Sequence, residues 1–177
     1  MKKNCTLVAI LSLFLMLPST DAWAKKDKAP KSRPFKARFS TEFFNADFNP
    51  ATFIFTTVVE GSGNATHLGE CSFKAIHSFA FTTPTMTEGV AWNGALELGA
   101  ANGDILNATY VGDIVPSGDP EIPFLLLFTI TFDGGTGRFS EASGSADVIG
   151  LTTIEPDPSN GLFKGTSEFT FDGQIQY

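Results

Sequence analysis

Three residues that could bind a metal ion or support nucleophilic catalysis lie close together in the sequence: His67, Cys71 and His77. Histidine and cysteine are common zinc ligands, and a cysteine beside a histidine can act as a nucleophile. All three fall on one face of an alternating polar and apolar stretch, a pattern typical of a β-strand. Along an extended strand His67 and His77 would lie about 33 Å apart. The ligands of one zinc ion lie within about 2.3 Å of it, so we predict no metal site, no catalytic residue and no cofactor here.

The acidic residues give no stronger indication of a metal-binding or catalytic site. The Asp-Gly and Asn-Gly segments at 102–104, 133–134 and 157–161 are explained by turn formation, because their acids are too scattered to supply the six to eight oxygens that calcium needs. Glu70, Glu88 and Glu97 fall near strands, mostly on the polar face. A pocket for acid–base catalysis would need Tyr110 or Trp92 to point inward beside a carboxylate, and the sequence leaves this open.

The elements that must position these residues are strands. Side chains alternate with a period of two from Phe35 onward, and turn residues recur at short intervals. An antiparallel barrel or a sandwich fits this pattern, and we predict one all-β domain, an eight-stranded antiparallel β-barrel, because closure removes exposed strand edges. The expected strands are 35–43, 53–59, 65–81, 88–98, 105–114, 122–132, 138–150 and 163–177.

The predicted barrel interior is rich in aromatic side chains. Phe73, Phe79, Trp92 and Tyr110 are the candidate ligand-binding residues of this interior; strand parity directs the first three inward, and the direction of Tyr110 stays open. An eight-stranded barrel has an interior that side chains just fill or that holds one small ligand. We expect Cys71 to be buried, because it shares the face of Phe73.

The sequence makes a separate structural prediction for each of two further segments. Phe132–Gly144 reads as a glycine-rich hairpin whose second strand carries small residues on one face. Phe124–Phe128 is apolar on both faces, so it needs a second covering layer, which could be the N-terminal arm, a loop or another subunit.

The N-terminal segment is expected to direct export. Lys2 and Lys3 precede a short apolar run, and Ala22–Ala24 forms an A-x-A cleavage signature. We therefore predict a signal peptide over 1–24, a basic flexible leader over 25–34 and the barrel domain over 35–177, in a secreted or periplasmic protein without a stable membrane anchor. The 177-residue chain has a net charge of −7, and its acidic body makes nucleic acid a poor partner.

The segment Gly134–Phe139, followed by Ala142 and Gly144, resembles the late hairpin of allene oxide cyclase and dirigent proteins. Segments 61–69 and 101–104 resemble a pattern in small exported bacterial proteins of uncharacterised function. The resemblance implies an eight-stranded barrel and, because the cyclase family is trimeric, a homo-oligomer. It transfers no catalytic residue, since the polar interior sites of those families have no matching positions here.

Together these observations favour an exported, non-catalytic barrel that binds a small apolar ligand in or at its interior. Two alternatives stay open. The chain could be a cyclase-like or dirigent-like enzyme that uses the barrel cavity, or a structural protein that assembles through the Phe124–Phe128 strand.

Overall fold

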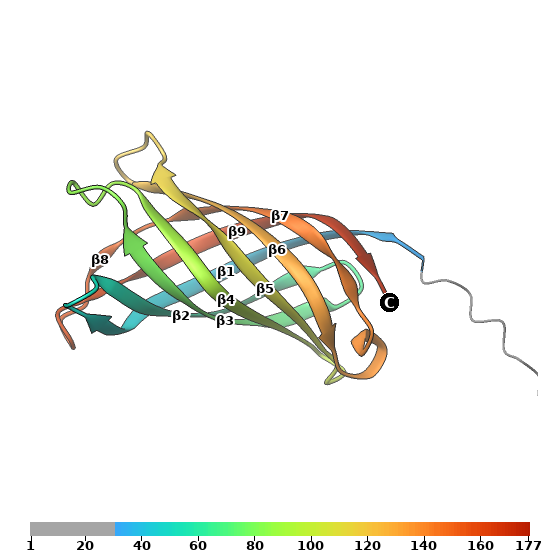
Figure 1. Cartoon of the computed structure of the whole chain (residues 1–177). Coiled ribbons are helices and arrows are strands. Elements are labelled where there is room, and N and C mark those ends of the chain that lie inside the picture. The colour runs from blue at the N-terminus through green and yellow to red at the C-terminus, as the bar shows by residue number, and fades with distance from the viewer. Residues whose placement is uncertain (1–30) are drawn as a thin grey trace, which may run out of the picture.

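The computed structural model describes residues 31–177, which form one closed antiparallel barrel (Figure 1). Eight long strands make the wall, in sequence order, and pairing of the first with the last closes it. The prediction of an all-β, eight-stranded antiparallel barrel is confirmed. The elements are β1 (Arg33–Asn49), β2 (Ile54–Ala65), β3 (Gly69–Phe81), β4 (Gly89–Ala100), β5 (Ile105–Pro116), β6 (Phe124–Gly135), the 3₁₀ helix η1 (Gly137–Phe139), β7 (Ser143–Thr152), the two-residue β8 (Glu155–Pro156) and β9 (Phe163–Gln176).

The N-terminal predictions fall largely outside this region. The predicted signal peptide and residues 25–30 of the predicted leader are not among the described residues. The last two residues of that leader belong to β1, since Arg33 pairs with Ile175 and Pro34 with Gln174 of β9. The barrel wall therefore begins two residues before the predicted Phe35.

Side-chain alternation makes the interior of the barrel apolar. In β1, Phe35, Ala37 and Phe39 are buried, whereas Lys36 and Arg38 between them are exposed. The same alternation recurs in the other long strands and yields one continuous core. Burying each phenylalanine stabilises the fold by roughly 1.5–3 kcal/mol relative to leaving it exposed.

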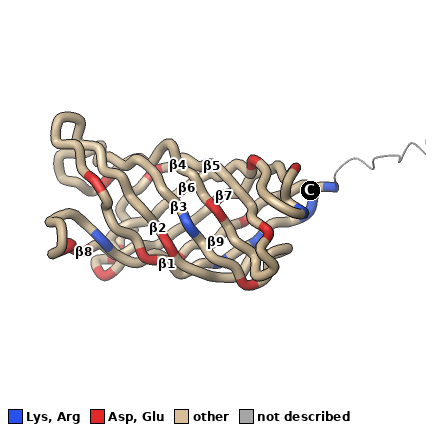
Figure 2. Tube along the Cα trace, turned by 90° about the horizontal axis from the view of Figure 1, so that it is seen from below, with Lys and Arg blue, Asp and Glu red and all other residues tan. Residues whose placement is uncertain are grey.

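Charged residues are spread along the strands and turns of the barrel wall (Figure 2), and none of those described is buried. Within residues 31–177, the buried polar or charged side chains are Thr41, Asn45, Thr57, His77, Thr152 and Ser167, with no aspartate, glutamate, lysine or arginine among them. Every buried polar side-chain atom in this part of the chain has a hydrogen-bond partner. The interior is therefore apolar with a few paired neutral groups.

The two ends of the barrel differ (Figure 1). We call the end with the C terminus and η1 the η1 end, and the opposite end, where β7 leads through β8 into β9, the β8 end. At the η1 end, the Phe139 ring is fully buried and packs edge-on against the Tyr177 ring at 5.1 Å. The predicted strand 138–150 is wrong over its first residues, because the chain between β6 and β7 forms η1 and inserts Phe139 into the core instead of making a tight hairpin.

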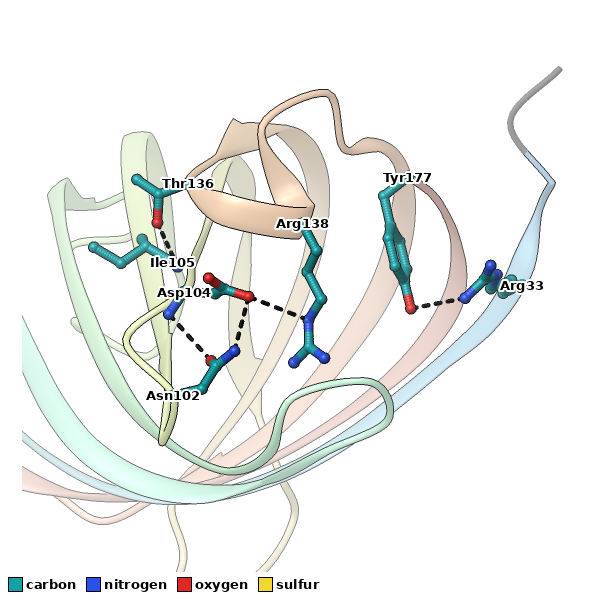
Figure 3. A network of polar contacts seen from close by, with 7 residues as sticks. All are labelled: Arg33, Asn102, Asp104, Ile105, Thr136, Arg138 and Tyr177. Atoms are coloured by element: carbon teal, nitrogen blue, oxygen red, sulfur yellow. Dashed lines mark hydrogen bonds and ion pairs between the residues drawn. The ribbon is translucent and has the colours of Figure 1, made fainter. Parts of the chain in front are cut away.

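Polar contacts hold the turns of the η1 end together (Figure 3). Asn102 donates a 2.9 Å hydrogen bond to the Asp104 carboxylate, which lies 3.5 Å from Arg138 Nε. The backbone N–H of Ile105 donates to the Thr136 hydroxyl at 2.9 Å. These contacts tie the β4–β5 turn to η1, so the Asn102–Asp104 segment acts as the turn that the sequence predicts.

The turn between β2 and β3 lies later than predicted. Residues 60–64 continue β2, and the chain reverses at 66–68, where His67 has a φ of 72° and Gly69 a φ of 73°. Gly63 faces inward, and a Cβ there would lie 2.8 Å from the Phe39 ring. This glycine therefore serves close packing within the barrel. The expectation that Ala65–Phe81 is one strand is wrong, because the chain turns at 66–68, between the end of β2 and the start of β3.

The Phe124–Phe128 strand is not buried on both faces. Leu126 and Phe128 point into the core, whereas Leu127 is 41% exposed and Leu125 is half-buried. No covering layer lies over this face among the described residues, so the apolar outer face of β6 is open.

Candidate functional site

A cavity of about 80 Å³ lies inside the barrel toward the β8 end. At this end the lining includes half-buried side chains of strand ends and of the segment after β7, among them Phe81, Phe124 and Ile154. The cavity is lined chiefly by aromatic rings: Phe43, Phe73, Phe79, Phe81, Phe124, Phe128, Phe163, Phe169 and Phe171. Such a lining favours an apolar guest.

A histidine–tyrosine pair forms the main polar feature of this lining. His77 on β3 and Tyr110 on β5 are both buried, and His77 Nδ1 lies 2.7 Å from the Tyr110 hydroxyl. Their rings meet edge-on with centroids 5.6 Å apart. The pair bridges strands that are not neighbours, because β4 runs between them.

An irregularity in β4 makes this contact achievable. Between Ala91 and Gly94, two residues of β4, Trp92 and Asn93, lie opposite the single residue Val111 of β5, which is a β-bulge. Asn93 has a φ of 53°, a left-handed conformation that asparagine tolerates better than most residues. Bulges re-aim side chains, and this one lies beside both His77 and Tyr110 in the sheet.

Gly94 supplies the space for the tyrosine ring. A Cβ on Gly94 would lie 2.6 Å from ring atoms of Tyr110, closer than carbon atoms can approach without displacement. The ring therefore lies flat over the glycine of the neighbouring strand. The bulge, Gly94 and the hydrogen bond together fix the position of the Tyr110 hydroxyl.

Burial keeps both members of the pair neutral. Loss of hydration lowers the pKa of His77 from 6.5 to about 4, because the imidazolium is disfavoured in an apolar interior. The same loss raises the pKa of the Tyr110 phenol. At neutral pH the cavity therefore contains a neutral imidazole and a neutral phenol.

The pair belongs to a longer polar row at one level of the barrel. Thr57 pairs with His77 in the β2–β3 register and with Asn45 in the β1–β2 register. The Thr57 hydroxyl donates a 2.8 Å hydrogen bond to Asn45 Oδ1. We call Asn45, Thr57, His77 and Tyr110 the polar row; all four line the cavity.

A second polar pair in the lining is fully occupied. The hydroxyls of Thr152 and Ser167 lie 2.7 Å apart, and Thr152 also donates to the carbonyl of Thr166 at 2.9 Å. These groups satisfy one another and the backbone, so they offer little to a ligand.

The structure brings three of the four predicted site residues together. Phe73, Phe79 and Tyr110 line the cavity. Trp92 is half-buried and does not line it, because the bulge changes the parity of β4: Ala91 points inward and Trp92 outward. Strand parity alone could not have shown this, since the extra residue is visible only in the pairing.

The remaining chemistry-bearing residues are separated. His67 lies at the β2–β3 turn, where its Nε2 is 2.9 Å from the carbonyl oxygen of Pro34, whereas His77 faces the cavity. Cys71 is buried, as predicted, and burial raises its pKa to about 11. The partner of His77, Tyr110, lies 33 residues away in the sequence, and no local pattern indicates the contact.

Carboxylates do not contribute to this cavity. Its lining within residues 31–177 contains no acidic or basic side chain apart from His77. In the described region no three histidine, cysteine or acidic residues are grouped closely enough to hold a metal ion. The arrangement can enclose an apolar group and hydrogen-bond to it, and it offers no carboxylate for proton transfer.

The fold and the cavity define the class of this protein: a closed eight-stranded antiparallel barrel with a small apolar internal cavity. Comparisons with protein-family models, with curated proteins and with solved structures found no match. The resemblance to allene oxide cyclase and dirigent proteins therefore rests on the glycine-rich segment alone. No helix among residues 31–177 is long and apolar enough to cross a membrane.

Proposed function

We propose that this chain is an exported barrel that binds a small apolar ligand in its cavity without transforming it. The observation that carries the proposal is the aromatic cavity at the β8 end, whose lining combines nine phenylalanines with the polar row and the Thr152–Ser167 pair. Eight-stranded barrels of this size hold side chains or one small ligand. An apolar pocket with a few placed polar groups is the usual form of a small-molecule site.

The size of the cavity limits the ligand. Its volume of about 80 Å³ is well below the roughly 300–1,000 Å³ of sites that enclose drug-sized molecules. A cavity on the order of 150 Å³ can take up benzene. The volume of this cavity is about half of that, so the enclosed part of the proposed ligand is a group smaller than a benzene ring or a short chain, and the rest of the ligand lies toward the half-buried side chains of the β8 end.

Native mass spectrometry of the protein, purified from its own host without detergent, tests this proposal. We expect a mass excess that disappears on denaturation. The variant Val59→Phe adds a ring inside the cavity and should abolish the excess, whereas Val58→Phe adds the same ring on the outer face of β2 and should keep it. A wild-type protein that carries no excess and takes up no added small aromatic compound would contradict the proposal.

Self-assembly is a second candidate function, favoured by one specific observation. The outer faces of β6 and β7 carry adjacent apolar side chains, in which Leu127 pairs with Ile149 and Leu125 with Leu151. Ile149 is 55% and Leu151 is 43% exposed. Contiguous apolar surface of this kind is typical of interaction sites. We propose that a second copy of the chain covers it.

The oligomeric mass tests the assembly candidate. Replacing Leu125 and Leu127 together by aspartate should convert an oligomer to a monomer, because two charges would be buried in the contact. Replacing Ser62 and Asn64 by aspartate makes the same change on the exposed face of β2 and should leave the oligomer intact. A wild-type protein that is monomeric by light scattering would rule this candidate out.

A further inference from the structure

The polar row contains hydrogen-bond donors that no protein group uses. His77 Nδ1 is occupied by Tyr110, and Asn45 Oδ1 by Thr57. Within residues 31–177 neither His77 Nε2 nor Asn45 Nδ2 has a side-chain or backbone hydrogen-bond partner. In the same residues every fully buried polar side-chain atom has such a partner, so these two atoms are not fully buried. Both atoms therefore keep contact with open space, and both residues line the cavity.

The tautomer of His77 follows from its partner. The Tyr110 hydroxyl is buried among apolar groups, and the Nδ1 of His77 is its one hydrogen-bond partner in the described chain. If Nδ1 carried the proton, the phenolic O–H would be left without an acceptor, which costs about 1–3 kcal/mol. The favoured arrangement has Tyr110 donating to a bare Nδ1, with the imidazole proton on Nε2.

The cavity therefore offers N–H groups that can donate hydrogen bonds to a ligand, and within the described residues it offers no anionic group that could accept one. An apolar hydrocarbon would leave these donors unpaired on entry, which is unfavourable in an apolar interior. A carboxylate would accept hydrogen bonds from these donors but would be buried without a cation, since no lysine or arginine lines the cavity among residues 31–177. A neutral oxygen acceptor matches both conditions.

We propose that the polar row makes the cavity selective for small apolar molecules that carry a neutral carbonyl or equivalent acceptor oxygen, bound by His77 Nε2–H and Asn45 Nδ2–H. This inference rests on the proposed binding function and names the ligand class for the same cavity. Tyr110 is a positioning residue in it, because it acts on the ligand only through the tautomer of His77.

Acetophenone and α-methylstyrene form the test pair, since they differ chiefly in a carbonyl oxygen replaced by a methylene carbon. Binding of each is titrated by NMR to the wild type and to the His77→Phe, Tyr110→Phe double variant, which removes both partners of the pair without leaving either one unpaired. We expect the variant to bind acetophenone about threefold to tenfold more weakly, the ratio equivalent to one net hydrogen bond. Its affinity for α-methylstyrene should not fall and should rise if anything, because entry of this hydrocarbon no longer leaves the His77 N–H unpaired.

Two further variants define the donors. The double variant Asn45→Leu, Thr57→Val removes the other donor. It should weaken the binding of acetophenone, as the first double variant does, without weakening the binding of α-methylstyrene. Ser78→Ala, one position along β3 and outside the cavity lining, is the control that should change neither affinity. Benzoate should fail to bind the wild type at pH 7.

Nitrogen NMR gives a readout that needs no ligand. The chain has two histidines, so the signals lost in the His77 variant identify His77, and they should show Nε2 protonated and Nδ1 bare at pH 7. A protonated Nδ1, or an acetophenone affinity unchanged in the double variant, would overturn the inference while leaving cavity binding intact. If neither compound binds the wild type, the proposed function itself fails and the ligand class fails with it.

Discussion

The buried histidine should make the folded barrel sensitive to mild acid. His77 has a pKa of about 4 in the folded chain, against 6.5 when exposed. Between these values the unfolded chain binds a proton at His77 that the folded chain does not. The contribution of neutral His77 to the free energy of unfolding is therefore fully present above pH 6.5 and is lost as the pH falls toward 4.

The magnitude follows from the two pKa values. Each unit of difference corresponds to about 1.4 kcal/mol, so the full loss is about 3 kcal/mol. Between pH 7 and pH 5 the expected loss is about 2 kcal/mol, because protonation of the unfolded chain is nearly complete by pH 5 and that of the folded chain has hardly begun. This is a large part of the roughly 5–15 kcal/mol stability of an ordinary domain.

Urea denaturation at pH 7 and pH 5, followed by tryptophan fluorescence, measures this loss. The double variant His77→Phe, Tyr110→Phe should be close to wild type at pH 7, since replacing both partners of a hydrogen bond by apolar groups is nearly neutral. It should lose about 2 kcal/mol less than wild type on going to pH 5. His67 is present in both proteins, so its contribution cancels, and an equal loss in both would refute the assignment to His77.

Three other outcomes test the packing of the barrel. Gly94→Ala should destabilise the fold by about 1–3 kcal/mol in urea denaturation, because the added methyl group meets the Tyr110 ring; wild-type stability would contradict this packing. Cys71 should react with a thiol reagent at pH 8 only after unfolding, since its thiol is buried and its pKa is about 11; rapid labelling of the native protein would contradict it. At the η1 end Phe139→Ala should cost about 3–5 kcal/mol, whereas Arg138→Ala should cost less than about 1 kcal/mol, because its ion pair is partly exposed; equal costs would contradict the view that the buried ring, and not the ion pair, holds η1 in place.

The barrel itself could be predicted because its determinants are local. Alternation such as Phe35, Ala37 and Phe39 against Lys36 and Arg38 specifies which face of β1 is buried, and closure follows from repeating it over eight strands. The positions of the turns were harder to predict from the sequence. Glycine marks turns, but it also permits close packing, and Gly63 serves the second purpose against Phe39.

The site was only partly predictable because it depends on register. Parity placed Phe73 and Phe79 correctly, but the bulge at Asn93 reverses parity for Trp92. A bulge adds one residue to one strand, and nothing in the composition of β4 indicates where pairing absorbs it. The contact between His77 and Tyr110 crosses β4 at that same point, so it could not be inferred before the register was known.

Stability alone does not account for the polar row. A barrel interior filled with phenylalanine needs no histidine, and an apolar pair in place of His77 and Tyr110 would be nearly neutral at pH 7 and more stable in acid. The row also depends on a residue with positive φ, Asn93, and on a glycine that the tyrosine ring must cover. Departures from the local rules of a fold are expected at functional sites, where they are compensated elsewhere. Here they converge on one wall of the cavity, which supports placing ligand recognition there and not on the η1 end, where Phe139 fills the interior.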